Sequence, residues 1–117
     1  KLPPNSAERN AQEPAALLAA IRVPQTIAAT AVAVLEIADR VVNFVNYHLL
    51  SDQAVCADLA MATTRCAIYN VRVNLTEALS PADRRSIESS IRRLLSPAAI
   101  LIQHLSPRIW ARHAQGV

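Results

Sequence analysis

The chain has 117 residues, of which 52% are hydrophobic, 18% are charged and 3% are aromatic, and its formal net charge is +3. Its single glycine argues against β-hairpins and Gly-rich nucleotide-binding loops, because both usually need glycine for tight backbone turns. With so few aromatic residues, the core must be built from Ala, Val, Leu and Ile. The composition therefore predicts one all-α domain, a bundle of four to five helices.

The apolar fraction is high for an isolated chain of this size, and it predicts a homodimer or a higher oligomer. A membrane partner is not expected, because Glu36, Asp39 and Arg40 interrupt the most apolar stretch before it reaches about 18 residues. Nucleic acid is not expected either, because the arginines form no dense stripe and lack stacking aromatic neighbours. An anionic small molecule fits the weak positive charge better.

Residues 1–13 contain two prolines and many polar side chains, which is typical of a linker, and residues 14–117 are expected to form the helical bundle. The first helix should begin at Pro14. A second helix should begin at Pro24, because proline is favoured in the first turn of a helix. Its buried stripe is expected to be Ile27, Ala31, Val34, Ala38, Val41 and Val45.

A third helix is expected from residue 51 to residue 75, with Ser51 as its N-cap and Asp52 in its first turn. Its last part, "YNVRVNL", alternates like a strand, but the helical period continues through it and no hairpin partner is present. The inward positions of this helix are expected to be Val55, Leu59, Ala62, Cys66, Tyr69 and Val73.

Cys56 and Cys66 are expected to be small buried residues in a reducing, cytoplasmic environment. Ten helical residues place them about 15 Å apart, too far for a disulfide within one helix. No histidine is spaced with them as a zinc site requires, so no metal is predicted.

The pair Ser-Pro occurs three times, at residues 80–81, 96–97 and 106–107, and each pair is a typical N-cap and first helical residue. Asp83 strengthens the first of these starts. A helix from Pro81 should direct Ile87, Ile91, Leu94 and Leu95 inward. Pro97 then either kinks this helix or begins a new one.

Polar side chains on one side of the third helix are the candidate functional residues. Asp52 and Asn70 share a face but lie about 27 Å apart along the helix axis, so they can meet only in a site that another subunit completes. Asp52 either stabilises the helix N-terminus or transfers protons. A buried pair, Asn70 and Asn74, would need hydrogen-bond partners on a neighbouring helix or a ligand. His48 is either a solvated loop residue or a proton carrier beside Asp52.

The segment "NYHLLSDQAV…CAIYNVRVNL" resembles the cyclodeaminase/cyclohydrolase family, in which an Asn-containing turn, a Ser-Asp helix start and a run close to N-V-x-I-N-L follow one another. The matching residues are Asn46, Ser51-Asp52 and Asn70 to Leu75. The resemblance implies a folate-handling, dimerising helical bundle with a tetrahydrofolate derivative as substrate and no further cofactor. The implied reaction is elimination of ammonia from 5-formiminotetrahydrofolate or hydrolysis of methenyltetrahydrofolate.

Within this resemblance six residues are the candidate site. Asp52 and the neighbouring His48 would be catalytic, and the substrate-binding residues would be Ser51, Asn70, Arg72 and Asn74. Arg72 points away from the asparagines and would meet either an anionic tail of the substrate or an acidic neighbour. The family's Gly-rich N-terminal half has no counterpart here. The chain is therefore expected to be the C-terminal part of a larger domain, to use a partner chain that supplies the missing half, or to be a non-catalytic interaction module on the same fold.

Overall fold

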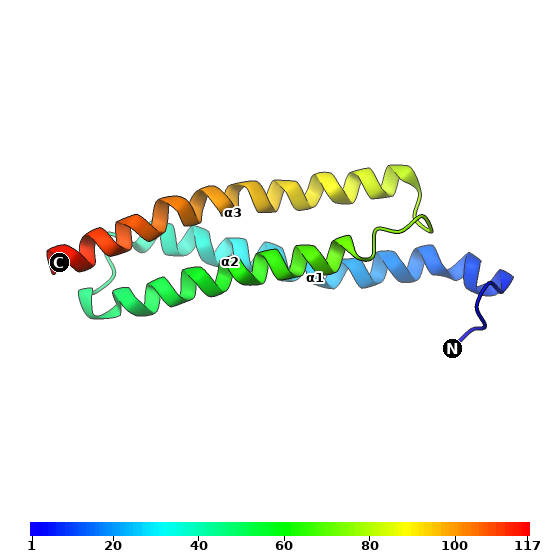
Figure 1. Ribbon diagram of the computed structural model, residues 1–117, viewed down its shortest axis with the longest axis horizontal. Helices are drawn as coiled ribbons and strands as arrows, with labels where there is room; N and C mark the ends of the chain where they lie inside the picture. The colour runs from blue at the N-terminus through cyan, green and yellow to red at the C-terminus, as the bar shows by residue number, and fades with distance from the viewer.

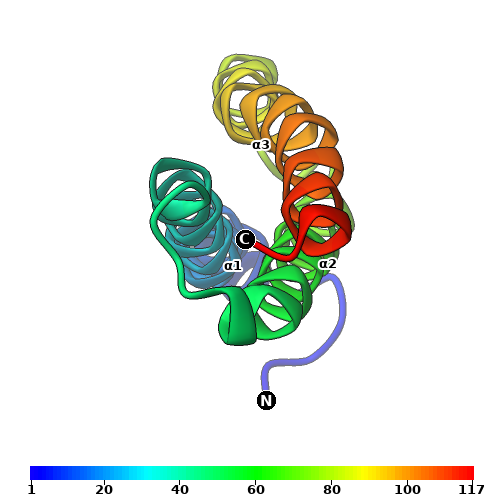
Figure 2. The ribbon, with the colours of Figure 1, turned by 90° about the vertical axis from the view of Figure 1, so that its left-hand side faces the viewer.

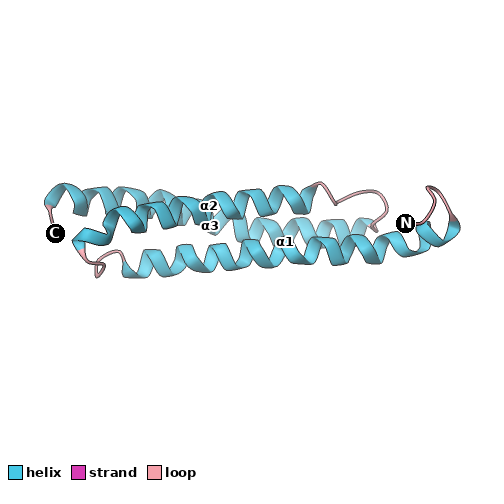
Figure 3. Ribbon diagram, turned by 90° about the horizontal axis from the view of Figure 1, so that it is seen from below, coloured by secondary structure: helices cyan, strands magenta, loops and turns pink.

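The computed structural model describes residues 1–117 as three long helices and no strand. Helix α1 spans Ala7–Val41, the short 3-10 helix η1 spans Tyr47–Leu49, α2 spans Leu50–Arg72 and α3 spans Pro81–Gln115. The helices run side by side along the long axis of a molecule measuring 65 × 26 × 15 Å (Figure 1). Seen from below, the loops lie only at the ends of this bundle (Figure 3). The expected all-α class is confirmed, but the expected count of four to five helices is wrong.

The count differs because three prolines do not end helices. Pro24 lies inside α1, and Pro97 and Pro107 lie inside α3. An internal proline removes one backbone hydrogen bond and costs about 3 kcal/mol, which burial of apolar residues on both sides of it can offset. Around Pro97 the helix keeps packing, with Ile91 and Ala98 both buried, and Figure 1 shows α3 as one continuous curved helix.

The start of α1 also differs from the expectation, because the helix begins at Ala7 and not at Pro14. Ser6 supplies the N-cap: its Oγ accepts a hydrogen bond from the backbone N–H of Arg9 at 3.1 Å. Pro14 therefore lies within the helix rather than at its first position.

The predicted start of α3 is confirmed. Ser80 Oγ accepts from the backbone N–H of Asp83 at 3.0 Å, and Pro81 is the first helical residue. Gly116 ends the helix in the left-handed conformation, with φ of 72°. The Ser-Pro pair coincides with a helix start here because the preceding chain, from Asn74 to Leu79, is not helical.

The core lies where α3 packs against both α1 and α2. One cluster is centred on Leu35, Met61 and Leu105, and a second on Ile21, Ile68 and Ile91. The expected inward direction of Ile87 and Ile91 is confirmed. The end of α3 is tied to the α1–α2 connection by Arg112, whose Nη1 donates to the carbonyl oxygens of Val42 at 2.8 Å and Val45 at 2.6 Å.

The inward face predicted for α2 is wrong. The predicted positions Val55, Leu59, Cys66, Tyr69 and Val73 are all exposed. The buried face instead consists of Leu50, Gln53, Ala57, Ala60, Met61, Thr64, Ala67, Ile68 and Val71. The prediction of helix rather than strand in "YNVRVNL" is confirmed as far as Arg72, after which the chain turns.

Helix α1 is long and apolar enough to cross a bilayer by length and composition, with a stretch of mean hydropathy 1.6. The sequence argument missed this stretch because Glu36, Asp39 and Arg40 lie near the C-terminal end of the helix and leave the preceding turns uninterrupted. Core helices of soluble proteins have the same composition, and α1 packs against both other helices. Only 22% of the stretch is buried, however, so much of its apolar surface has no partner within the protomer.

Candidate functional site

An open groove of about 640 Å³ runs between α1 and α2. Most of its lining is apolar; the contributing residues are Thr26, Ile27, Thr30, Ala31 and Val34 from α1, and Asp52, Val55, Cys56, Leu59, Ala60 and Thr63 from α2. A smaller depression continues it along α2 and shares Ile27, Leu59 and Thr63 with it. The two together form one trough with Asp52 at one end and Asn70 at the other.

The threonines of the groove use their hydroxyl hydrogens within their own helices. Thr26 donates to Arg22 O at 3.0 Å, Thr30 to Thr26 O at 2.9 Å, and Thr63 to Leu59 O at 2.7 Å. Their oxygens therefore remain available mainly as acceptors. Since Asp52 contributes the only carboxylate, the wider part of the groove suits a largely apolar ligand that carries N–H donors. Sequence reasoning missed these threonines, although their i, i+4 spacing in an Ala- and Val-rich helix is visible.

The start of α2 is capped differently from the prediction. The helix begins at Leu50, one residue before Ser51, and no side chain caps it. The cap belongs to η1, where Asn46 Oδ1 accepts from the backbone N–H of His48 at 3.0 Å. Ser51 and Asp52 are therefore the second and third residues of the helix, and both are exposed.

His48 lies on the turn before Asp52 and is exposed. Its ring packs edge-on against Tyr47, with ring centroids 5.5 Å apart. Tyr47 in turn stacks on His113 of α3 at 5.9 Å. His48 is absent from the groove lining, so within the protomer only Asp52 of the two predicted catalytic residues faces the groove.

The three candidate residues near the C-terminal end of α2 make different contacts. Asn70 is exposed and lines the end of the trough, so the expected burial of the asparagine pair is wrong. Asn74 Nδ2 donates to Asn70 O at 2.9 Å, a bond inside one helical turn rather than across the bundle. Arg72 lies 3.5 Å from Glu88 of α3, which matches the acidic neighbour foreseen as one of its two alternatives.

Both cysteines are exposed, which contradicts the prediction that they are buried. Cys56 and Cys66 both line the trough, near its opposite ends. They are free thiols, and no three His, Cys, Asp or Glu side chains are grouped so as to hold a metal ion.

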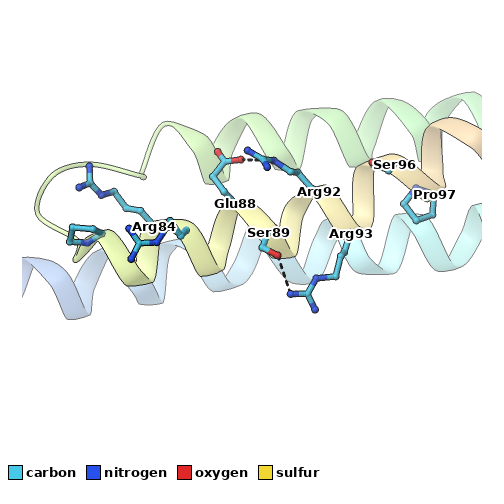
Figure 4. A pocket seen from close by; sticks show the side chains of 9 residues that line it. Arg84, Glu88, Ser89, Arg92, Arg93, Ser96 and Pro97 are labelled. Atoms are coloured by element: carbon cyan, nitrogen blue, oxygen red, sulfur yellow. Dashed lines mark hydrogen bonds and ion pairs between the residues drawn. The ribbon is translucent and has the colours of Figure 1, made fainter.

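A second concave surface lies on the outer side of α3 alone (Figure 4). It gathers four arginines, Arg84, Arg85, Arg92 and Arg93, which the sequence argument treated as dispersed. Glu88 pairs with Arg92 at 3.9 Å, and Arg93 Nη2 donates to Ser89 Oγ at 3.1 Å. Because all of its lining comes from one exposed helix, this surface has a positive potential but no walls that would enclose a ligand.

Gln53 is a buried polar residue of α2 that was not predicted from the sequence. Gln53 Nε2 donates to Ala38 O at 2.7 Å and joins α2 to α1, while its Oε1 is buried without a hydrogen-bond partner. No local pattern marks this residue, because its partner on α1 lies 15 residues away in the sequence.

Residues 1–93 match the family model described as formiminotransferase-cyclodeaminase. This range includes both sides of the trough and all six predicted site residues. No curated protein and no solved structure matches the chain.

Proposed function

The chain belongs to the formiminotransferase-cyclodeaminase family, a family of folate one-carbon cyclodeaminase and cyclohydrolase enzymes, and from this premise we propose that it binds a tetrahydrofolate derivative in the α1–α2 trough. The reaction we propose is ammonia elimination from 5-formiminotetrahydrofolate, or hydrolysis of methenyltetrahydrofolate at the same position. The observation that carries the proposal is the family match together with an apolar groove whose one carboxylate is Asp52.

The character of the groove supports a folate-type ligand. Its volume of about 640 Å³ lies within the range of about 300–1,000 Å³ that is usual for small-molecule sites. A pterin is flat, and it carries N–H donors along one edge. The apolar residues Ile27, Val34 and Leu59 would pack against its faces, while the Asp52 carboxylate would accept from its edge.

The proposed role of Asp52 is proton transfer at the one-carbon unit. In the cyclodeaminase reaction the formimino group reacts as its amidinium cation, N5–CH=NH2⁺. N10 attacks the formimino carbon, and the double bond from that carbon to the departing nitrogen becomes a single bond. The carboxylate carries the N10 proton to this nitrogen, the carbon–nitrogen bond breaks, and NH3 leaves as the methenyl cation forms between N5 and N10. Such general acid–base assistance contributes about 10²- to 10⁴-fold to a rate. His48, one turn earlier, is the second proposed proton carrier.

The remaining predicted residues divide between the two ends of α2. Ser51 lies beside Asp52, whereas Asn70 and Arg72 lie about 27 to 30 Å away along the helix, and Asn74 follows its end. Within one protomer they cannot hold the same small ligand as Asp52. The proposal therefore includes a second chain that brings the two ends together, either another copy or a chain that supplies further helices.

The test is turnover by the full chain with each folate. Ammonia release together with the appearance of methenyl absorbance reports the cyclodeaminase, and loss of methenyl absorbance reports the cyclohydrolase. We expect Asp52→Asn to lower kcat by about 10²- to 10⁴-fold and to change KM by less than about threefold.

Asp58→Asn is the matched control, because Asp58 is also an exposed acid of α2 but lies outside the groove lining. Its turnover should stay within about twofold of the unmodified chain. Turnover of Asp52→Asn within threefold would contradict the acid–base role. Absence of saturable folate binding by the unmodified chain would contradict the proposal as a whole.

A second candidate function is a non-catalytic helical interaction module. The observation that favours it is that the groove is open and that Asp52 and His48 are both exposed in the protomer. This candidate predicts a fully helical circular dichroism spectrum and self-association without any folate binding.

A further inference from the structure

A separate groove of about 690 Å³ lies between α1 and α3. Seen end-on, these two helices lie next to each other along the side of the bundle that α2 does not cover (Figure 2). The lining of this groove contains two charged residues, and both are arginines: Arg22 of α1 and Arg93 of α3. The groove therefore combines a positive potential with two helical walls, which the arginine surface on the outer side of α3 lacks.

The two arginines lie at almost the same level of the bundle. Helices α1 and α3 run in the same direction (Figure 1), and the bond between Asp39 and Arg108 joins residues that are 69 positions apart in the sequence. By the same offset, Arg22 is level with Ile91. Arg93 lies two residues farther, which is about 3 Å along the helix axis. The two side chains therefore enter the groove from opposite walls at one place.

The side chains of α3 divide between its two neighbours. Glu88 extends toward α2, where it pairs with Arg72 at 3.5 Å (Figure 4). Ser89 and Arg93 extend toward α1 in the same view. Arg93 Nη2 donates to Ser89 Oγ at 3.1 Å, which holds the guanidinium on this side. The acid that neutralises part of α3 therefore lies on the flank away from the groove.

No acidic side chain compensates the two arginines of the groove. Arg22 and Arg93 take part in none of the three ion pairs of the chain. Farther along the same two helices an acid does face a base, because Asp39 of α1 pairs with Arg108 of α3 at 2.8 Å. Two like charges across a groove repel each other. An anion between them replaces that repulsion with charge-assisted hydrogen bonds.

The groove also offers two neutral donors. Gln25 lies about one turn after Arg22, and Ser90 lies about one turn before Arg93. Neither side chain makes a hydrogen bond within the chain, so the amide hydrogens of Gln25 and the hydroxyl hydrogen of Ser90 are free. Two charged donors and two neutral donors therefore line one groove, and no acid competes for them.

We propose that this groove binds the phosphoryl group of a small phosphate monoester, with Arg22 and Arg93 on opposite sides of it. The group carries three acceptor oxygens that point in different directions, so donors from both walls can reach it. A carboxylate has two oxygens in one plane, which suit a single guanidinium fork better. The site goes beyond the proposed function and does not depend on folate, because it lies on the α3 side of α1 and the trough lies on the α2 side.

The rest of the groove suits a small organic group. The volume of about 690 Å³ lies within the range of about 300–1,000 Å³ that is usual for small-molecule sites, and one phosphoryl group fills only part of it. Ala29, Ala33 and Leu94 line the remainder with apolar surface. Ala33 lies about 16 Å along α1 from Arg22, so an aliphatic part of the ligand can extend in that direction.

Nuclear magnetic resonance of the full, nitrogen-15-labelled chain tests this site. Propyl phosphate is the probe, and sodium chloride keeps the ionic strength constant during the titration. We expect saturable shifts of the resonances of Arg22, Gln25, Ser90 and Arg93. Inorganic phosphate should bind at least about threefold more weakly, because it lacks the methylene groups that the apolar lining covers.

Substitutions of single arginines locate the site. Arg22→Gln and Arg93→Gln should each weaken propyl phosphate binding at least about tenfold, because each removes a charged donor. Arg93→Lys keeps the charge but loses the planar fork, so it should weaken binding at least about threefold. Arg85→Gln is the matched control, since Arg85 is also an exposed arginine of α3 but lies outside the groove lining, and its affinity should stay within about twofold. Because all three arginines are exposed, the helical circular dichroism spectrum should be unchanged.

Several outcomes would overturn the proposal. Absence of saturable shifts in the folded, unmodified chain would exclude the site. Shifts that sodium chloride alone reproduces, or that extend equally to Arg84 and Arg85, would show a diffuse counterion atmosphere over α3. Saturation by succinate at lower concentrations than by propyl phosphate would assign the groove to a carboxylate ligand. Equal losses for Arg85→Gln and Arg93→Gln would mean that net charge, rather than the groove, controls binding.

Discussion

Both faces of α2 carry apolar residues at helical spacing, but the two faces differ in side-chain size. The buried face is rich in alanine, with Ala57, Ala60 and Ala67 beside Met61 and Ile68. The exposed face carries bulkier residues, among them Val55, Leu59 and Tyr69. Small residues let the backbones of α1 and α3 approach closely, so they mark the face that packs within the protomer. Periodicity alone detects both stripes and cannot tell which one the chain buries by itself.

The largest expected effect is on the free energy of unfolding, which should differ between substitutions at Ile68 on the buried face and at Tyr69 on the exposed face. Ile68→Ala should lower the free energy of unfolding by about 2–5 kcal/mol, because it empties a buried site in the core. Tyr69→Ala should change it by less than about 0.5 kcal/mol, because Tyr69 is exposed. Urea unfolding at a concentration low enough for monomers measures both. Similar losses for the two variants would mean that the assignment of the faces is wrong.

Helix capping is a smaller contribution that lies away from both faces. Ser80→Ala should destabilise the protomer by about 1 kcal/mol, because it removes the acceptor for Asp83 N–H at the start of α3. Ser96→Ala, inside the same helix, should cost less than about 0.5 kcal/mol. Thermal unfolding of the two variants compares them directly, and equal losses would argue for a helix break at Pro97.

The smallest expected effect concerns the buried face. Gln53→Leu removes the bond to Ala38 O but also removes a buried oxygen that has no partner. These two changes oppose each other, so stability should stay within about 1 kcal/mol. Gln53→Ala should cost more, because it also leaves a void. Urea unfolding ranks the two. A greater loss for leucine than for alanine would contradict this account, because both variants lack the bond to Ala38 O and only alanine leaves a void.

The sequence predicted the parts of the fold that local chemistry controls. Ser80 caps α3 as expected, and Ile87 and Ile91 face the core. The same Ser-Pro pattern failed at residues 96–97 and 106–107, because buried residues lie on both sides of each proline. They are Ile91 and Ala98 around Pro97, and Leu105 and Ile109 around Pro107. Whether a proline ends a helix is decided by such tertiary contacts, which local patterns do not contain.

The candidate site was only partly visible in the sequence. Asp52 and Asn70 were identified with their correct separation along one helix, and both line the trough. The contribution of α1, through Thr26 and Thr30, could not be inferred, because it depends on which helix lies beside α2 and at which level. The family resemblance could be inferred from the order of short motifs, which requires no knowledge of this packing, and the family model confirms it over residues 1–93.

The most direct test of the account is equilibrium binding of a tetrahydrofolate derivative to the full chain. Because Leu59 lines both parts of the trough, Leu59→Glu should weaken saturable binding at least about tenfold. Ile100→Glu, at an exposed position of α3, should leave the dissociation constant unchanged, and isothermal titration calorimetry measures both. Equal affinities of the two variants, or no saturable binding by the unmodified chain, would contradict the account.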